Sequence, residues 1–311
     1  MKMIEAPKTN INEKSMLEIA GTARVNYKFF APPWLFDGSC NMLFAPSGHG
    51  KSHWAFNLAL TIAEGGVWLG QQCTQAKVLY IDGEMGESQW LKRFPGNKFL
   101  SDTQDYLKII CPQHFPSGLM YSLSDKKHHD FWFEKCSNYQ VIFIDNYLST
   151  CLPTEGRETD VILWQSAQRL IQRLKDAGKA IVLIHHTNKS GIDQLGTSLR
   201  DNYMDTIFRL RQWPRQYLNN GLTWEIKIPK DRNEFFKNKL ETLIDVVFTS
   251  DGISTQEKDI YQERKTIACE LFRMGCTKTN IAKELGVDEN RVTEMVFTIK
   301  NKTERTEEDL I

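Results

Sequence analysis

Residues 40–52 read Cys-Asn-Met-Leu-Phe-Ala-Pro-Ser-Gly-His-Gly-Lys-Ser, and the rest of the chain is organised around this stretch. Residues 42–44 have the apolar character of a short buried strand, and the small residues at 47–50 predict a tight turn. From Lys51 onward, apolar side chains recur at helical spacing, at Trp54, Leu58 and Ile62. A strand, a glycine-bearing turn, Gly-Lys-Ser and a helix, in this order, make up a phosphate-binding loop.

The chemistry of phosphate binding explains these residue types. Backbone amides of the turn and of the helix N-terminus point at phosphate oxygens, and only small residues let the chain come this close. Ala45 stands where the consensus has its first glycine, and alanine is small enough for a position that closes the strand. The lysine would reach the outer phosphates, and the serine hydroxyl would hold Mg²⁺. The predicted nucleotide-binding residues are Pro46, Ser47, Gly48, His49, Gly50, Lys51 and Ser52.

Composition places the chain among ordinary globular proteins. Its 311 residues, 41% hydrophobic and 25% charged, have room for one large domain or a large one with a small one. The formal net charge is zero, so any nucleic-acid binding must use local patches rather than an overall field. Seven cysteines without CxxC spacing argue against a disulfide framework or a zinc site. Without an early apolar run, we expect a cytoplasmic protein with no membrane partner.

An alternation of apolar strands and helices follows the loop. Strands are predicted at 77–82, 106–110, 141–145 and 180–184, and a clear amphipathic helix at 159–177. This alternation predicts a parallel sheet covered on both faces, which binds its ligand at the carboxyl ends of the strands. Runs at 206–210, 223–228 and 243–248 predict further strands, in part antiparallel. The predicted fold class is α/β, with a mostly parallel central sheet.

Three polar residues fall at predicted strand ends, where the ligand is expected. Asp145 closes an apolar strand, as the Walker B residue of phosphate-loop proteins does when it positions magnesium through water. Glu84 could orient and deprotonate the water that attacks the terminal phosphate, and Asp82, two residues earlier, is its rival. His186 could sense the terminal phosphate. The plain alternatives are a capping aspartate, an exposed turn glutamate and a packed histidine.

The chain beyond the sheet predicts a separate helical module. Residues 276–300 have the pattern helix, tight turn, helix, with Thr277 and Asp288 as caps, and look like a helix-turn-helix. The second helix would expose Asn290, Arg291, Thr293 and Glu294, which could meet a major groove. Acids and bases are balanced there, so docking to a protein stays open beside duplex DNA. The predicted divisions are an N-terminal arm (1–31), a core (32–250), the module (257–300) and a flexible tail (301–311).

Taken together, these motifs resemble the RecA-like ATPases of plasmid and phage replicative helicases, the RepA and DnaB group. The resemblance covers about residues 32–249 and rests on the phosphate loop, Asp82-Gly83-Glu84, the strand ending at Asp145, and His-His-Thr-Asn-Lys-Ser-Gly at 185–191. It implies a RecA-like core, ATP with Mg²⁺ held by Ser52 and Asp145, Glu84 as catalytic glutamate and His186 as sensor. RepA-type members carry a His-His pair there, whereas DnaB has Gln.

The same resemblance implies an oligomer. Lys230-Asp231-Arg232-Asn233 is similar to the Lys-x-Arg finger that reaches into the adjacent subunit's site, so hydrolysis would require assembly. The family forms rings, most often hexamers, around single-stranded DNA. The loops at 146–160 and 187–200 would line the channel, with Lys189 and Arg200 contacting the DNA backbone. Arg200 is also the reserve candidate for the finger.

The resulting prediction is an ATP-dependent replicative DNA helicase of a plasmid, phage or similar mobile element. One alternative is a recombinase or recombination mediator that forms filaments on single-stranded DNA. Another is a non-translocating ATPase switch, in which the C-terminal module binds duplex DNA or a replication protein and the core only regulates it. Rings, filaments and module-dependent duplex binding distinguish the three.

Overall fold

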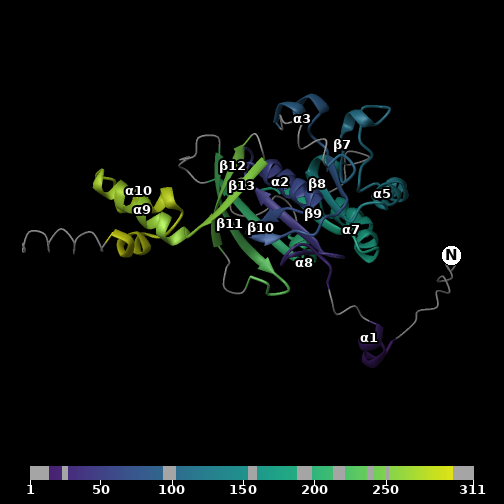
Figure 1. Cartoon of the computed structure of the whole chain (residues 1–311), viewed down its shortest axis with the longest axis horizontal. Helices are drawn as coiled ribbons and strands as arrows, with labels where there is room; N and C mark the ends of the chain where they lie inside the picture. Colours follow the sequence, from purple (N-terminus) through teal and green to yellow (C-terminus); the bar gives the residue numbers. More distant parts are fainter. Residues whose placement is uncertain are drawn as a thin grey trace, which may run out of the picture.

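The strand that leads into the phosphate loop, β3 (Cys40–Ala45), lies inside a large sheet (Figure 1). The computed structural model describes residues 14–22, 27–93, 103–152, 160–187, 198–212, 221–236, 241–249 and 252–296. Within these residues the sheet has nine strands in the order β13-β12-β11-β10-β3-β9-β8-β6-β7. The parallel strands are β7 (Leu107–Ile110), β6 (Val78–Asp82), β8 (Val141–Asp145), β9 (Ala180–His186), β3 and β10 (Thr206–Gln212).

The other part of the sheet is antiparallel. It consists of β11 (Gly221–Asp231), β12 (Glu241–Thr249) and β13 (Gly252–Lys258). The predicted α/β class with a mostly parallel central sheet is confirmed. Thr249 pairs with Gly252, so the sheet continues past the predicted core boundary at 250 and ends at Lys258. The strand Gly-Ile-Ser-Thr-Gln-Glu-Lys has no apolar alternation, and backbone pairing with β12 defines it.

Helices cover both faces of the parallel strands (Figure 1). One face packs against α2 (Lys51–Glu64) and α3 (Glu87–Arg93), the other against α5 (His129–Cys136) and α7 (Asp160–Asp176). The short helix α6 (Tyr147–Thr150) follows β8, and the short helix α8 (Leu199–Tyr203) precedes β10. The helix predicted at 159–177 is α7, and it is amphipathic: Val161 at its start is exposed, and its buried face consists of Trp164, Ala167, Leu170, Ile171 and Leu174.

The segments around the loop's entry strand complete the core. The hairpin of β1 (Phe29–Ala31) and β2 (Leu35–Phe36) buries Phe30 and Ala31, so the core begins before residue 32. Further short elements are β4 (Val67–Trp68), β5 (Gln71–Gln72) and the 3₁₀ turns η1 (Pro112–His114) and η2 (Lys126–His128). The helix α1 (Met16–Thr22) lies apart from the core in Figure 1 and has exposed side chains. Residues 1–13 and 301–311 lie outside the described part of the chain.

The C-terminal module folds as a helix-turn-helix beyond the edge formed by β11–β13 (Figure 1). It contains α9 (Ile260–Arg273), α10 (Lys278–Leu285) and a helical stretch at 289–296, which share an apolar cluster. Thr277 and Asp288 cap their helices as predicted, by accepting the backbone N–H groups of Asn280 and Arg291 at 3.3 and 2.8 Å. Of the predicted surface residues, Asn290, Arg291 and Glu294 are exposed, and Thr293 is half-buried.

Two general features bear on the protein's environment. None of the helices in the described ranges is long and apolar enough to cross a membrane. All seven cysteines are free thiols.

Candidate nucleotide site

The phosphate loop has the backbone shape that its sequence requires. Gly48 and Gly50 both adopt a φ of 80°, which favours glycine, and Gly50 is the N-cap of α2. A Cβ at Gly50 would lie 2.8 Å from the ring of Trp224, so a larger residue could not pack there. Ala45, in contrast, is a buried residue of β3 with an ordinary strand backbone, so this position does not need the positive φ of a glycine.

Lys51 lies at the base of this loop. Its Nζ donates hydrogen bonds to the carbonyl oxygens of Ala45 at 3.1 Å and Pro46 at 3.0 Å, and the residue is 7% exposed. Burial lowers the pKa of Lys51, while the carboxylates of Asp145 and Glu84 raise it. The cation is therefore placed beside the amides that would surround the phosphates, as nucleotide binding requires.

Asp145 and Ser52 form the oxygen pair expected for Mg²⁺. The Tyr80 hydroxyl donates to Asp145 Oδ2 at 2.6 Å. Burial raises the pKa of Asp145, and the hydroxyl groups of Tyr80 and Ser52 beside the carboxylate lower it. A buried carboxylate beside a helix-terminal serine fits Mg²⁺, which takes one or two protein oxygens, waters and substrate phosphates. Accordingly, the described residues contain no group of three or more His, Cys, Asp or Glu side chains that could hold a metal by themselves.

The turn after β6 separates the two rival carboxylates. Asp82 is 1% exposed, and its Oδ1 accepts the backbone N–H groups of Glu84 at 2.8 Å and Met85 at 2.9 Å. Gly83 N–H donates to the Asp145 carbonyl at 2.7 Å, which ties this turn to β8. Asp82 thus holds the turn in shape, while the side chain of Glu84 is 56% exposed. We therefore propose Glu84 as the general base and a positioning role for Asp82.

Glu84 is held at the site by two neighbouring strands. The Asn146 amide donates to Glu84 Oε1 and lies 3.1 Å from His186 Nε2, which is 3.7 Å from the same carboxylate oxygen. Interaction with His186, followed by the Asn146 hydrogen bond, lowers the pKa of Glu84. An ionised carboxylate is the form that a general base must have. Sequence reasoning missed Asn146, although its place directly after the strand-ending Asp145 was a usable signal.

The two histidines at the end of β9 have different surroundings. His185 is fully buried and packs edge-on against the ring of Tyr147, with 5.4 Å between ring centroids. His186 is the one that reaches the carboxyl edge of the sheet, where it is paired in register with Ala45. The structure thus brings Glu84, Asp145 and His186 together beside the phosphate loop.

Lys230 and Arg232 lie at the opposite end of the parallel strands. Thr206 pairs with Asp231 and with Asn41, near the amino end of β3, whereas the phosphate loop follows the carboxyl end at Ala45. Four strand residues separate the two ends, roughly 13 Å at 3.3 Å per residue. In this arrangement Arg232 does not reach the phosphate loop of its own chain.

The predicted DNA contacts have unequal outcomes. Arg200 is fully buried, donates to Asp160 Oδ1 at 2.7 Å and lies 4.6 Å from the ring centroid of Tyr147. A side chain held this way stabilises the fold and is accessible neither to a DNA backbone nor to the nucleotide site of a neighbouring subunit. Lys189 and most of both predicted channel loops, 153–159 and 188–197, lie outside the described residues.

Asp82 makes protein stability depend on pH. Burial raises the pKa of Asp82 to about 7, with Asp145 and Glu84 adding to the shift. A carboxyl that binds its proton more tightly in the folded protein opposes folding above its folded pKa, and this penalty disappears as the pH falls from about 7 toward 4. Without nucleotide, the free energy of unfolding of the parent protein, relative to that of Asp82→Asn, should therefore increase by roughly 2–4 kcal/mol when the pH is lowered from 8 to 5. Thermal unfolding at both pH values measures this, and parallel pH profiles of the two proteins would contradict it.

A comparison with protein families finds a match over this part of the chain. A family model described as an AAA domain (AAA_25) matches residues 26–191, more than half of the chain, including the phosphate loop, Glu84, Asp145 and His186. The chain belongs to this AAA family. Membership implies nucleotide binding, typically with Mg²⁺, at the loop described above. The matched part of this AAA protein ends before Lys230 and Arg232 and before the C-terminal module.

Two solved structures resemble this chain in fold. The flagellar accessory protein FlaH from Methanocaldococcus jannaschii is 14% identical with a TM-score of 0.50, covering 71% of this chain and 90% of its own. A KaiC-like protein from Pyrococcus horikoshii OT3 is 13% identical with a TM-score of 0.51, covering 74% of this chain and 97% of its own. A search of curated proteins found no match. At these identities the similarity concerns the fold alone, and the core is a RecA-like α/β ATPase domain.

Proposed function

We propose that this ATPase is the replicative DNA helicase of a plasmid, phage or similar mobile element, and that it encircles single-stranded DNA as a ring. The observation that carries the proposal is the separation of two complementary groups on one chain. The water-activating set, Glu84 with Asn146 and His186, lies at the carboxyl edge of the sheet. Lys230 and Arg232 lie at the amino edge. A head-to-tail assembly, which closes into a ring when the rotation permits, would complete each site with the next subunit's cations.

The same edge of the sheet supports a link from hydrolysis to DNA movement. β8 and β9 are neighbours, and the predicted channel loops begin directly after them, at Asn146 and Thr187. Asn146 and His186 both lie at the Glu84 carboxylate. A change at the terminal phosphate would therefore act on the first residues of both loops. Loops of a ring that converge on its centre could grip successive DNA phosphates.

Electron microscopy together with strand displacement tests the proposal. With Mg²⁺, an ATP analogue and single-stranded DNA, the protein should form closed rings, and with ATP it should separate a forked duplex. Lys51→Ala, which removes the cation at the base of the phosphate loop, should do neither of these nucleotide-dependent steps. Open filaments with strand-pairing activity would instead support the recombinase. Neither assembly nor unwinding in the presence of ATP would contradict the helicase.

A second candidate, a nucleotide-controlled DNA-binding switch, is favoured by the junction between phosphate loop and module. Gln212 and Trp224 are cross-strand partners on β10 and β11. Gln212 N–H donates to His49 Nδ1 at 3.1 Å, and Trp224 Nε1 donates to the His49 carbonyl at 3.0 Å. These two residues therefore hold the phosphate loop from the antiparallel side of the sheet.

The adjacent cross-strand pair, Arg211 and Glu225, holds the module. Arg264 of α9 donates to Glu225 Oε1 at 2.9 Å, with both residues nearly fully buried, and Arg211 donates to the Glu284 carbonyl at 3.3 Å. Neighbouring residues of a strand point to opposite faces, so Trp224 and Glu225 extend from opposite sides of β11. The same strands therefore contact the phosphate loop and the module. A movement of the phosphate loop on nucleotide binding would be transmitted through them to the module's docking contacts.

The switch predicts duplex binding that depends on nucleotide. Arg264→Met should undock the module, because it breaks a buried ion pair, and duplex binding should then become the same with and without ATP. Arg273→Met, on an exposed position of the same helix, is the control and should keep the parent behaviour. Binding titrations with a pool of duplex sequences measure this. A parent protein whose duplex binding ignores ATP would count against the switch.

A further inference from the structure

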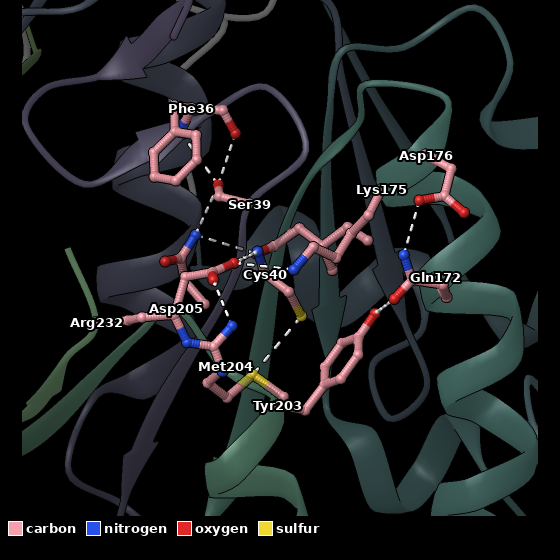
Figure 2. Close-up of polar contacts among 12 residues, drawn as sticks. Phe36, Ser39, Cys40, Gln172, Lys175, Asp176, Tyr203, Met204, Asp205 and Arg232 are labelled. Carbon is pink, nitrogen blue, oxygen red and sulfur yellow. Dashed lines mark hydrogen bonds and ion pairs between the residues drawn. The ribbon is translucent and has the colours of Figure 1, made fainter. Parts of the chain in front are cut away.

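One buried carboxylate at the amino edge of the sheet serves two cations (Figure 2). Asp205, just before β10, accepts from Lys175 Nζ on Oδ2 at 3.0 Å and from Arg232 Nη1 on Oδ1 at 3.1 Å. The backbone N–H of Cys40 also donates to Oδ2, at 2.8 Å. The Asp205 side chain is only 10% exposed, so it needs a cation close by.

The two cations are held differently. The Lys175 side chain is 14% exposed and lies 4.9 Å from the ring centroid of Tyr203. Tyr203 is itself fixed to α7, because its hydroxyl donates to Gln172 at 2.8 Å. The Arg232 side chain is 46% exposed, and its other hydrogen bond is to the Asn202 carbonyl at 2.6 Å. Arg232 is therefore the partner that can turn outward, while Lys175 is enclosed.

We propose that Lys175 is a positioning residue that allows Arg232 to leave Asp205 and reach the neighbouring subunit's phosphates. The inference rests on the proposed function, in which Arg232 acts across a subunit interface. Removing the partner of a buried charge is strongly unfavourable. With Lys175 and the Cys40 amide still on Oδ2, Asp205 stays neutralised after Arg232 departs. Without Lys175, departure of Arg232 would strand the carboxylate, so Arg232 would stay bound to it.

Steady-state ATP hydrolysis by Lys175→Met tests this in the full-length protein with single-stranded DNA. The kcat should fall at least about tenfold, while KM for ATP stays within about twofold, because the phosphate loop is at the other edge of the sheet. Adding Asp205→Asn should restore kcat to that of Asp205→Asn alone, since a neutral amide does not trap Arg232. A purely structural role for Lys175 would make the double variant no better than the single one.

Lys179→Met is the matched control, because Lys179 also donates its ammonium hydrogens to protein oxygens, the backbone carbonyls of Ser137 and Tyr139, without touching Asp205. Lys175→Arg, which keeps the cation, should retain kcat within about threefold. An unchanged kcat in Lys175→Met, or no rescue by Asp205→Asn, would overturn the inference. If Lys175→Met does not fold, Lys175→Gln is judged by the same comparisons. Arg232→Ala distinguishes failure of the proposed function from failure of this inference. Normal hydrolysis by Arg232→Ala would refute the proposed function itself. Lost hydrolysis by Arg232→Ala together with normal hydrolysis by Lys175→Met would refute only the role of Lys175.

Discussion

Glu84→Gln should bind ATP as tightly as the parent protein and hydrolyse it about 10²–10⁴-fold more slowly, the contribution typical of a general base. The amide keeps the size of the side chain and can still accept from Asn146, but it cannot take a proton from water. The low pKa that His186 and Asn146 confer on Glu84 keeps the parent side chain ready for this step. Single-turnover hydrolysis, with ATP affinity measured separately by a fluorescent analogue, distinguishes lost chemistry from lost binding.

Two variants make this result specific to Glu84. Glu87→Gln removes a nearby carboxylate whose side chain is 69% exposed and which pairs outward with His114 at 3.1 Å, so turnover should stay within about twofold of the parent. Lys51→Ala should instead lose ATP binding. The assignment of Glu84 would be wrong if Glu84→Gln kept near-normal turnover while Asp82→Asn lost it, because Asp82 would then be the base.

Arg232→Ala should bind ATP yet lose about 10³–10⁵-fold in kcat, the range seen when an arginine that stabilises transferring phosphoryl groups is removed. Its guanidinium lies at the amino edge of the sheet, so this loss would have to arise at a neighbour's site. Mixing Arg232→Ala with Lys51→Ala should restore part of the hydrolysis. Some interfaces of a mixed ring then combine an intact phosphate loop from one variant with an intact Arg232 from the other.

The control for this experiment is Arg173→Ala. The Arg173 side chain is 44% exposed and paired with Asp130 at 2.9 Å, which matches the exposure and the carboxylate partner of Arg232. It lies on α7 and should leave kcat within about twofold of the parent, as expected for an exposed ion pair. No recovery at any mixing ratio, with mixed assembly verified, would show that Arg232 does not act between subunits.

Local sequence was sufficient for the elements that carry the nucleotide site. Gly-Lys-Ser after an apolar strand predicts the phosphate loop, because the turn's conformation and the helix start depend on residues a few positions apart. Continuous apolar runs predicted the central parallel strands β6, β8 and β9, since strands buried on both faces leave few polar positions. The chemistry of strand ends pointed to Glu84, Asp145 and His186, because parallel strands place their carboxyl ends at one edge.

Only the tertiary structure determines which of the candidate residues are buried, which are exposed and which are paired with one another. Asp82 and Glu84 are both carboxylates at the end of one predicted strand, and only the packing of their turn against β8 buries one and exposes the other. Arg200 has the positive charge of a DNA contact, yet it is buried and paired with Asp160, 40 residues earlier in the chain. The joining of Lys175, Asp205 and Arg232 likewise depends on contacts between distant segments. Burial and ion pairing of this kind follow from strand order and register, which are set by long-range packing and leave no local pattern in the chain.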